Sequence, residues 1–366
     1  MSERTKSLRA WAVAMVVCAL AAAFGWRLTR GSAEPRAFTR CPVGVMGTGC
    51  QLVAYAPGDQ AERAEKALAA AEAQLRAVEA RMSAYLEMSE ISHFNAAPAG
   101  EEVKLSGQTM EVLRIARKYH SETGGAFDVT CRPILQLWKR AGKANRPPTP
   151  QELAEAGALA GWTGVELLDD GARKLKAGAG IDLGGVAKKY AIDLAAEAMR
   201  RTGVPAGLVN VGGDIRCFGR KPSGENWQVA IRDPFHPDGG QVIGTLSIRE
   251  GAVCTSGNYE RFVEIGGKRY SHIVDPRTAM PADLVPSVTV VGPDAVGSGV
   301  WATALSALGP DGLELMPKDS HLEAMLITGD ADDHQVHMTE AFRAMLTGAL
   351  NLPATRPAAQ SAVADR

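Results

Sequence analysis

Residues 181–219 read IDLGGVAKKYAIDLAAEAMRRTGVPAGLVNVGGDIRCFG. This stretch places one Gly-Gly pair on each side of a helix that the apolar spacing predicts from Ala187 to Arg201, closed by Gly203. Each pair follows an apolar run, and glycine lets the backbone come close to a ligand. Backbone N–H groups at such strand ends can surround an anion such as a phosphate. Two ordinary tight turns would give the same letters, so the rest of the chain has to decide between these interpretations.

Helix and strand patterns mix along the rest of the chain. Apolar residues at intervals of three and four predict helices, and short Val- and Ile-rich runs between Trp227 and Val291 predict strands in hairpin-like succession. This succession favours an α+β fold, with mixed sheets and packed helices, over a doubly wound one. The other predicted elements are a strand over 48–56, helices over 64–82 and 106–119, a loop over 145–150, a helix over 300–308, a strand over 324–328 and a helix over 339–346.

Composition narrows the class of protein. A chain of 366 residues with 46% hydrophobic residues can bury a large core without disulfides or metals. Forty basic and forty-one acidic side chains give a formal net charge of −1, and no basic run is interleaved with aromatic residues. Nucleic acid is therefore excluded as an expected partner.

The first 35 residues have the pattern of an export segment. Basic residues precede and follow an uncharged, mostly apolar run over 10–26. The run has the minimal length for crossing a bilayer, so it fits either a cleaved signal peptide or a retained anchor. We expect the body, residues 36–350, on the periplasmic side of the bacterial inner membrane, followed by a disordered tail over 351–366. Cys41 and Cys50 lie close together after this segment, and a disulfide between them is permitted there.

Three polar motifs carry side chains suited to chemistry on a ligand. Tyr85 follows the predicted long helix, where its ring can stack on a flat heterocycle or simply be half-buried at a helix end. Asp128 follows a Gly-Gly turn, where a carboxylate accepts hydrogen bonds from ribose or ring N–H groups, although Asp is also a common turn residue. His272 stands three residues before Asp275, which fits either a general base or a structural histidine on a strand.

Taken in order, these blocks resemble the ApbE family of FAD:protein FMN transferases. The resemblance runs from Met46 to Thr303 and covers roughly residues 40–350. It implies an ApbE-like, T-fold-like α+β domain over 36–350. The motifs that carry it are MGT, MSxYxxxSExSxFN, GGAFDxT, IDLGGxAK, VNxGGDI, TSGxYxRF, HIxDPRT and ATAL.

The resemblance implies a phosphoryl-transfer reaction that depends on magnesium. The FMN half of FAD moves to a Thr or Ser hydroxyl of a client flavoprotein, and AMP is released. The client would belong to a membrane or periplasmic electron-transfer chain, and the N-terminal segment would hold the enzyme at the inner membrane. Two other functions fit the same motifs: a non-catalytic periplasmic protein that binds FAD, and a pyrophosphatase that splits FAD with water.

The resemblance also implies roles for individual residues. His272 would be the base that takes the proton of the client hydroxyl, and it would also contact the dinucleotide. A magnesium ion would be held by the main-chain carbonyl of Ala187 and the hydroxyl of Thr303. The residues implied to bind FAD are Met46, Tyr85, Ala126, Phe127, Asp128, Gly184, Lys188, Tyr190 and His272.

The sequence departs from the family pattern at the metal site. Position 299 is Gly where the family has the Asp that binds magnesium, and Lys189 stands where the family usually has Gly. Ala279 likewise replaces a Gly after DPRT. Another acid could substitute for the missing carboxylate, FAD's own pyrophosphate could hold the metal weakly, or the chain could have kept only flavin binding. The candidate substitutes are Asp182, Asp214 and Asp294. If the site is merely weakened, Gly299→Asp should raise magnesium affinity and turnover.

Overall fold

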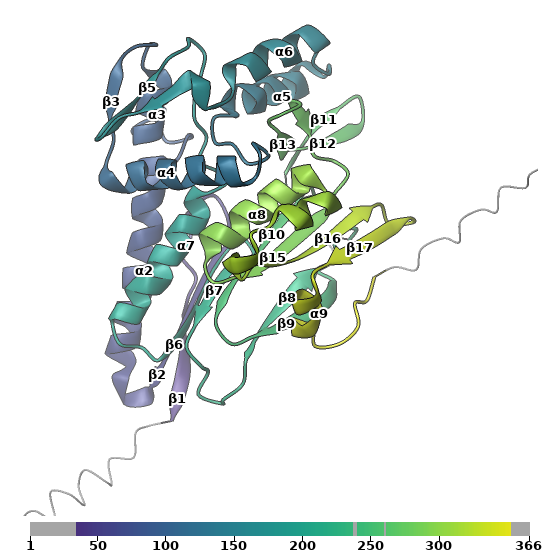
Figure 1. Ribbon diagram of the computed structural model, residues 1–366. Helices are drawn as coiled ribbons and strands as arrows, with labels where there is room; N and C mark the ends of the chain where they lie inside the picture. The colour runs from purple at the N-terminus through teal and green to yellow at the C-terminus, as the bar shows by residue number, and fades with distance from the viewer. Residues whose placement is uncertain (1–33, 237–239, 260, 353–366) are drawn as a thin grey trace, which may run out of the picture.

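A twisted antiparallel sheet of eight strands runs through the centre of the protein in this computed structural model (Figure 1). The structure describes residues 34–236, 240–259 and 261–352. Neighbouring strands are antiparallel throughout, as expected for hairpin-like succession in the sequence. Across the sheet the strands are β1 (Pro35–Arg40), β2 (Cys50–Pro57), β6 (Ala206–Val211), β7 (Asp214–Phe218), β10 (Gly251–Gly257), β15 (Ser287–Gly292), β16 (Glu323–Gly329) and β17 (His334–Met338).

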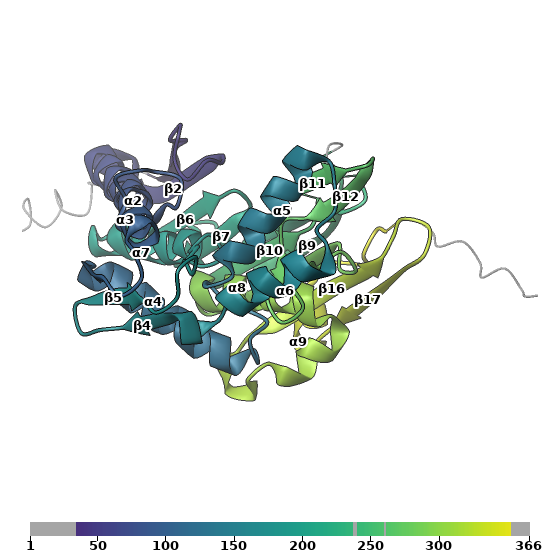
Figure 2. The ribbon, with the colours of Figure 1, turned by 90° about the horizontal axis from the view of Figure 1, so that it is seen from above.

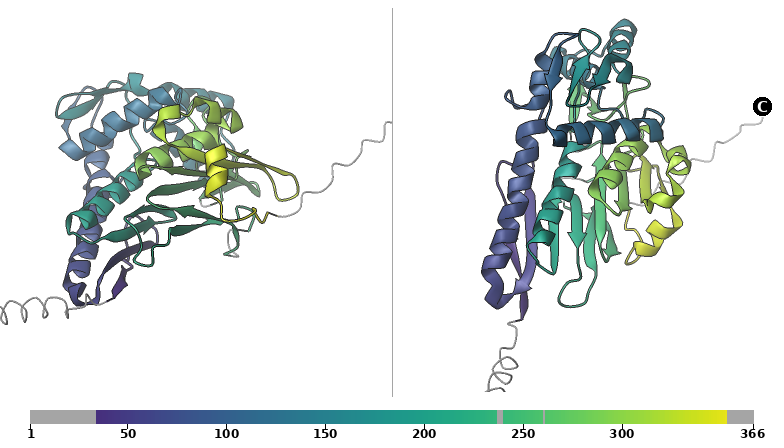
Figure 3. Two further views of the ribbon diagram at one scale, coloured as in Figure 1. Left: turned by 60° about the horizontal axis from the view of Figure 1, so that its bottom comes forward. Right: turned by 60° about the vertical axis from the view of Figure 1, so that its left-hand side comes forward.

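Three helices pack on one face of this sheet: α2 (Ala61–Met82), α7 (Ala187–Arg201) and α8 (Ala295–Leu308). Figures 1 and 3 show α2 and α7 running side by side along the sheet. The apolar stripe of α2 is buried against α7 and the sheet, as the spacing of its apolar residues predicts. The largest hydrophobic core of the protein lies in this layer.

The opposite face of the sheet carries a smaller core. The hairpin of β8 (Trp227–Arg232) and β9 (Val242–Ile248) covers it, together with α9 (Glu340–Met345). Trp227, Leu246 and Phe342 are buried there against side chains of the central strands. Burial on both faces explains why the central strands are rich in Val and Ile.

A third group of elements lies at one end of the α2–α7 layer, at the top of Figure 1, and Figure 2 looks down on it. It holds several segments that belong to the sequence motifs, so it places the candidate site at the junction of this group and the central sheet. Its elements are α3 (Glu90–Ala96), β3 (Glu102–Lys104), α4 (Gly107–Glu122), α5 (Arg132–Ala144), α6 (Pro150–Leu159), β4 (Val165–Leu167), β5 (Gly171–Lys174), β11 (Phe262–Ile265), β12 (Lys268–Ser271), β13 (Val274–Asp275) and β14 (Met280–Pro281).

Several boundaries and elements differ from the sequence predictions. The helix predicted over 300–308 begins at Ala295, because the side chain of Asp294 caps it by accepting from Gly297 N at 2.7 Å. Helices α3, α5 and α6 were not predicted. Helix α6 carries a clear signal, since Thr149 and Glu152 form a capping box around its start. The helix over 187–201 is confirmed, and Gly203 after it has φ of +83°.

Three predictions concern parts of the chain at or near its ends. The export segment over 1–35 and the tail over 351–366 lie almost wholly outside the described residues. Within the residues that the structure describes, no helix is both long enough and apolar enough to cross a membrane. Cys41 and Cys50 are both free thiols, so the disulfide that their spacing permits is not formed in this structure.

Candidate functional site

The second Gly-Gly pair turns the chain from β6 to β7 beside the loop that contains Met46. Gly212 and Gly213 have φ of +60° and +88°, and a Cβ on Gly212 would lie 2.6 Å from Oγ1 of Thr48. The N–H of Gly212 also donates to the carbonyl of Gly49 at 2.8 Å. Met46 itself has φ of +52°, which is unusual for a residue with a side chain. Such backbone conformations cluster at functional sites. The first and fifth motifs of the sequence therefore form one surface.

The first Gly-Gly pair lies against the GGAFD turn. A Cβ on Gly185 would lie 2.9 Å from a ring carbon of Phe127, so only glycine allows this approach. The N–H of Asp182 donates to the carbonyl of Val129 at 2.8 Å. Two motifs that are far apart in the sequence are thus joined by backbone and ring contacts.

The segment after α2 supports the same turn from the other side. The side chain of Asn95 brackets Ile181, accepting from its N–H and donating to its carbonyl, both at 2.8 Å. Nearby in the sequence, Tyr85 is 76% exposed, and Nζ of Lys139 lies 5.6 Å from the centre of its ring. The exposed ring is available for stacking, which is the role that the sequence predicts for it.

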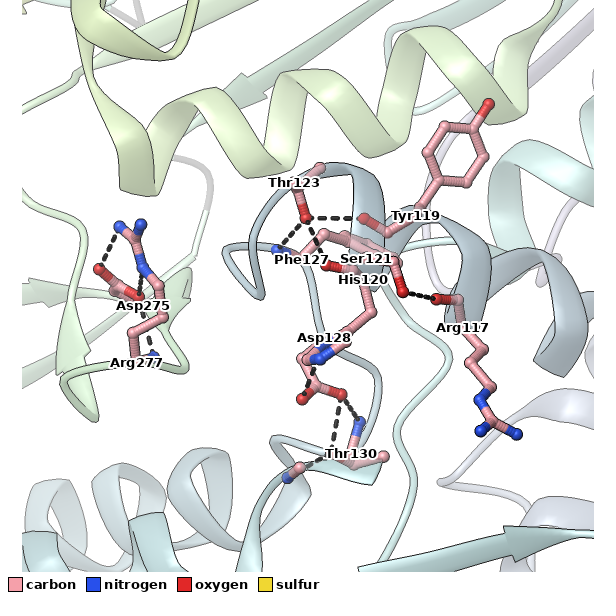
Figure 4. Close-up of polar contacts among 11 residues, drawn as sticks. Arg117, Tyr119, His120, Ser121, Thr123, Phe127, Asp128, Thr130, Asp275 and Arg277 are labelled. Carbon is pink, nitrogen blue, oxygen red and sulfur yellow. Dashed lines mark hydrogen bonds and ion pairs between the residues drawn. The ribbon is translucent and has the colours of Figure 1, made fainter. Parts of the chain in front are cut away.

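Asp128 is buried and fully engaged within the protein (Figure 4). Its Oδ1 accepts from the backbone N–H and the hydroxyl of Thr130, at 2.8 and 2.7 Å. Its Oδ2 lies 3.3 Å from Nδ1 of His120. This contact with Asp128 raises the pKa of His120, against the opposing effect of burial. Asp128 therefore holds the shape of the GGAFD turn, alongside its predicted contact with FAD, which stays a prediction.

The DPRT segment faces the same turn. Figure 4 shows Arg277 forked onto the carboxylate of Asp275, with N–O distances of 2.9 and 2.8 Å. A Cβ on Gly125 would lie 3.8 Å from Cγ of Arg277, so the two segments are in near contact. Two residues later, Ala279 has φ of +60°, a backbone conformation that favours glycine. The family's usual Gly at that position is explained by this conformation.

His272 lies in the connection between β12 and β13, with a defined tautomer. Its Nδ1 lies 2.8 Å from the carbonyl of Arg261, which can only accept, so Nδ1 carries the proton and Nε2 is left with its lone pair. The side chain of His272 is exposed at the surface, yet the chain around it desolvates the imidazole, and this outweighs the opposing hydrogen bond to Arg261 and lowers the pKa of His272 to about 4. The positive charges of Arg261, Lys189 and Lys188 act in the same direction. The imidazole is therefore neutral at physiological pH, as a general base requires.

Two lysines at the start of α7 converge on one carboxylate. Nζ of Lys188 lies 2.9 Å, and Nζ of Lys189 3.7 Å, from Oδ2 of Asp214. Asp214 is 2% exposed, and its other oxygen accepts from the N–H of Thr255 at 3.2 Å. Because Asp214 directly follows the second Gly-Gly pair, it brings both ammonium groups to the junction of the glycine turns. The sequence prediction included Lys188 here but assigned no role to Lys189.

The residues present do not fit the magnesium site that the resemblance implies. A Cβ on Gly299 would lie 2.4 Å from Cγ and from Cε of Lys189, so the place of the family's carboxylate is filled by a lysine stem. The hydroxyl of Thr303 donates to the carbonyl of Gly299 at 3.0 Å. Within the described part of the chain, no three His, Cys, Asp or Glu side chains are grouped so that they could hold a metal ion. Ala187 and Thr303 thus lack the carboxylate partner that magnesium needs.

The three acids considered as substitutes each have another partner. Asp294 caps α8, and Oδ1 of Asp182 accepts from the N–H of Gly184 at 2.8 Å. Asp214 accepts the two lysines. None of the three lies in a group of potential metal ligands among the described residues.

Four of the predicted FAD contacts are buried: Ala126, Phe127, Asp128 and Tyr190. Ala126 is 2% exposed within the GGAFD turn. Tyr190 is 7% exposed, and its hydroxyl donates to a carboxylate oxygen of Glu111 at 2.7 Å. Burial and this hydrogen bond raise the pKa of Tyr190. Tyr190 therefore joins α7 to α4, whereas Lys188 lies against Asp214, and the binding roles of these residues stay predictions.

The order of these motifs has a counterpart among known proteins. The sequence pattern of the ApbE family matches residues 46–326, which include every motif described above. The chain belongs to the ApbE family. Its long-range glycine contacts thus bring together the motifs that define this family.

Relatives of known structure and name agree with this assignment. A protein of Haemophilus influenzae named FAD:protein FMN transferase is 31% identical over 298 residues, covering 78% of this chain and 85% of that protein. The ApbE protein of Thermotoga maritima has a similar structure, with a TM-score of 0.75 and 28% identity, covering 85% of this chain and 99% of that one. The flavin transferase ApbE of Vibrio cholerae has a TM-score of 0.72 and 26% identity, covering 85% and 100%. The predicted ApbE-like α+β fold is confirmed.

Proposed function

We propose that this protein is a FAD:protein FMN transferase. It would take FAD as substrate, attach the FMN half to a Thr or Ser hydroxyl of a client flavoprotein and release AMP. The family membership supports this reaction, since relatives that cover most of the chain carry this name. The observation that carries the proposal is His272, whose unprotonated Nε2 is the proton acceptor that the reaction needs.

The transfer step follows from these groups. The client hydroxyl oxygen attacks the phosphorus of the FMN half, the bond from that phosphorus to the oxygen of AMP breaks, and AMP leaves with the bonding electrons. The hydroxyl proton passes to Nε2 of His272, whose Nδ1–H stays bonded to the carbonyl of Arg261. That hydrogen bond stabilises the imidazolium once it forms.

Lys188 supplies a positive charge that suits the phosphates of a dinucleotide. The glycine pairs act by shaping the turns, since the N–H groups of Gly184 and Gly212 are bonded within the protein. The open ring of Tyr85 is suited to stacking on a flavin or an adenine. The resemblance implies magnesium dependence, but the carboxylate ligand is missing from this chain, so we assign no step to the metal.

The client and the location are further parts of the proposal. The export pattern of residues 1–35 supports a position on the periplasmic side of the inner membrane, with protein flavinylation taking place there. The expected client is a flavoprotein of a membrane or periplasmic electron-transfer chain. Its Thr or Ser lies in the partner, so this chain does not identify it.

The test is to incubate the purified chain with FAD and a peptide-tagged flavoprotein acceptor. AMP release and FMN fluorescence fixed to the acceptor are measured together. Equal amounts of AMP and bound FMN are expected for the transferase. AMP without bound FMN would instead indicate a pyrophosphatase, and tight FAD binding without AMP a non-catalytic carrier, for which Gly299 is the supporting observation. His272→Ala should retain FAD binding and lose transfer, and loss of both would refute its role as the base.

A further inference from the structure

The two departures from the family pattern, at positions 189 and 299, are in direct contact. Gly299 is buried in α8, and the stem of Lys189 passes over its Cα so closely that any Cβ would collide with two of the lysine carbons at 2.4 Å. Those carbons belong to the lysine stem, so rotation of the ammonium alone would not relieve the collision. With Lys189 in this position, only glycine fits at position 299.

The lysine occupies this place in an ordered way. Lys189 is 7% exposed, and burying an ammonium group costs free energy unless a charged partner offsets it. Asp214 provides such a partner, with its Oδ2 3.7 Å from Nζ of Lys189. The same side chain follows Ala187 by two residues, at the turn where the family's metal would bind a carbonyl. A positive charge held by Asp214 thus lies on the side chain that covers position 299, where the family's carboxylate would stand.

We propose that the ammonium group of Lys189 takes the place of the metal ion, so that this enzyme binds and cleaves FAD without magnesium. The proposal rests on the transferase function above. The local charge supports it: a divalent cation with one carboxylate carries a single positive charge, and so does a lysine beside a glycine. In this proposal the lysine ammonium, which is covalently attached, replaces the bound metal ion. The positive electrostatic potential at the pyrophosphate of FAD stays the same.

A cation near the leaving group would stabilise the departure of AMP. When AMP leaves, negative charge grows on its phosphate oxygen, and a fixed positive group in a site shielded from water stabilises that charge. Lysine is a compact point charge that commonly binds phosphates. Nζ of Lys188 lies 2.9 Å from the same carboxylate oxygen of Asp214, so two ammonium groups lie near the N-terminus of α7. The proton of the client hydroxyl still goes to His272.

The experiment compares four proteins, each as the full chain, in EDTA and in added magnesium chloride. Wild type should transfer FMN at rates within about twofold in the two conditions. Lys189→Met, which keeps an unbranched stem over Gly299, should lose about a hundredfold in rate in both conditions. Lys189→Gly/Gly299→Asp, which rebuilds the family pattern, should become magnesium-dependent by about a hundredfold. Lys176→Met, which removes an exposed lysine, should behave like wild type.

Magnesium binding to the proteins without FAD, followed by calorimetry, gives a readout independent of turnover. The double variant should bind magnesium and the wild type should not. Loss of wild-type transfer in EDTA with recovery in magnesium would overturn the proposal. If none of the four proteins transfers FMN in either condition, the proposed transferase function is wrong. The role of Lys189 is then tested by the affinity of each protein for FAD in EDTA. A drop of at least about tenfold in Lys189→Met would support the lysine as the pyrophosphate's cation, and an unchanged affinity would refute it.

Discussion

Lowering the pH tests the base assigned to His272 most directly. A histidine with its ordinary pKa of about 6.5 is only about 9% unprotonated at pH 5.5. With the pKa lowered to about 4, His272 is about 97% unprotonated at that pH. Transfer at pH 5.5 should therefore proceed at nearly the rate seen at pH 8, whereas an ordinary histidine would leave about a tenth of it.

The assay is kcat/KM for FMN transfer between pH 4.5 and 8, measured by AMP release and by fluorescence fixed to the acceptor. The rate should fall only below about pH 5. Lys189→Met removes one of the charges that lower the pKa of His272, so the midpoint should move upward in that variant. An inflection near 6.5 in the wild type would refute the account of this site.

The same shift has a consequence for stability that the assay has to control. Because the folded-state pKa of His272 lies below its unfolded value, the unfolded chain takes up the proton first as the pH falls. Its contribution to the free energy of unfolding is therefore complete above about pH 6.5 and is lost as the pH falls toward about 4. Far-UV circular dichroism at each pH shows whether a rate loss comes from unfolding.

Three further substitutions test the packing that shapes the site, each by urea unfolding. Gly185→Ala should destabilise the protein by about 1–3 kcal/mol through its clash with Phe127, and Phe127→Leu in the same chain should recover part of the loss. Asn95→Ala should cost about 2–4 kcal/mol, because it leaves two backbone groups of Ile181 without their partner; a loss below about 0.5 kcal/mol would contradict that role. Ala279→Gly should stabilise by about 0.5–1 kcal/mol by relieving its positive φ, and a loss of stability would refute the strain.

Local sequence patterns predict several of the helices and strands of the fold. The helix over 187–201 was predictable because its apolar spacing and the glycine after it are both encoded within a few residues. The apolar residues alone predict a start for α8 at residue 300, five residues after its true start at Ala295. The signal for the true start is the capping carboxylate of Asp294, which lies before the apolar stretch. Helix α6 shows the same lesson, because its capping box marks a start that the apolar pattern does not.

The site was predictable as a set of motifs but less so in its contacts. Lys188 and Tyr190 are two residues apart in a helix, so they point in different directions, and the helical period alone could have shown this. The collision between Lys189 and position 299 joins two helices that are far apart in the sequence. Such a contact depends on how α7 and α8 pack, which no local pattern encodes. From sequence alone Gly299→Asp looks like a repair, whereas the structure makes it a clash.

That contact also limits the order in which the two positions can change during evolution. Lysine at 189 with aspartate at 299 is the combination that collides, so acquiring the new side chain first would require the lysine stem to move. The open route passes through a chain with glycine at both positions, which has neither the carboxylate nor the ammonium. A library that randomises both positions should therefore yield few folded proteins that combine lysine at 189 with aspartate at 299.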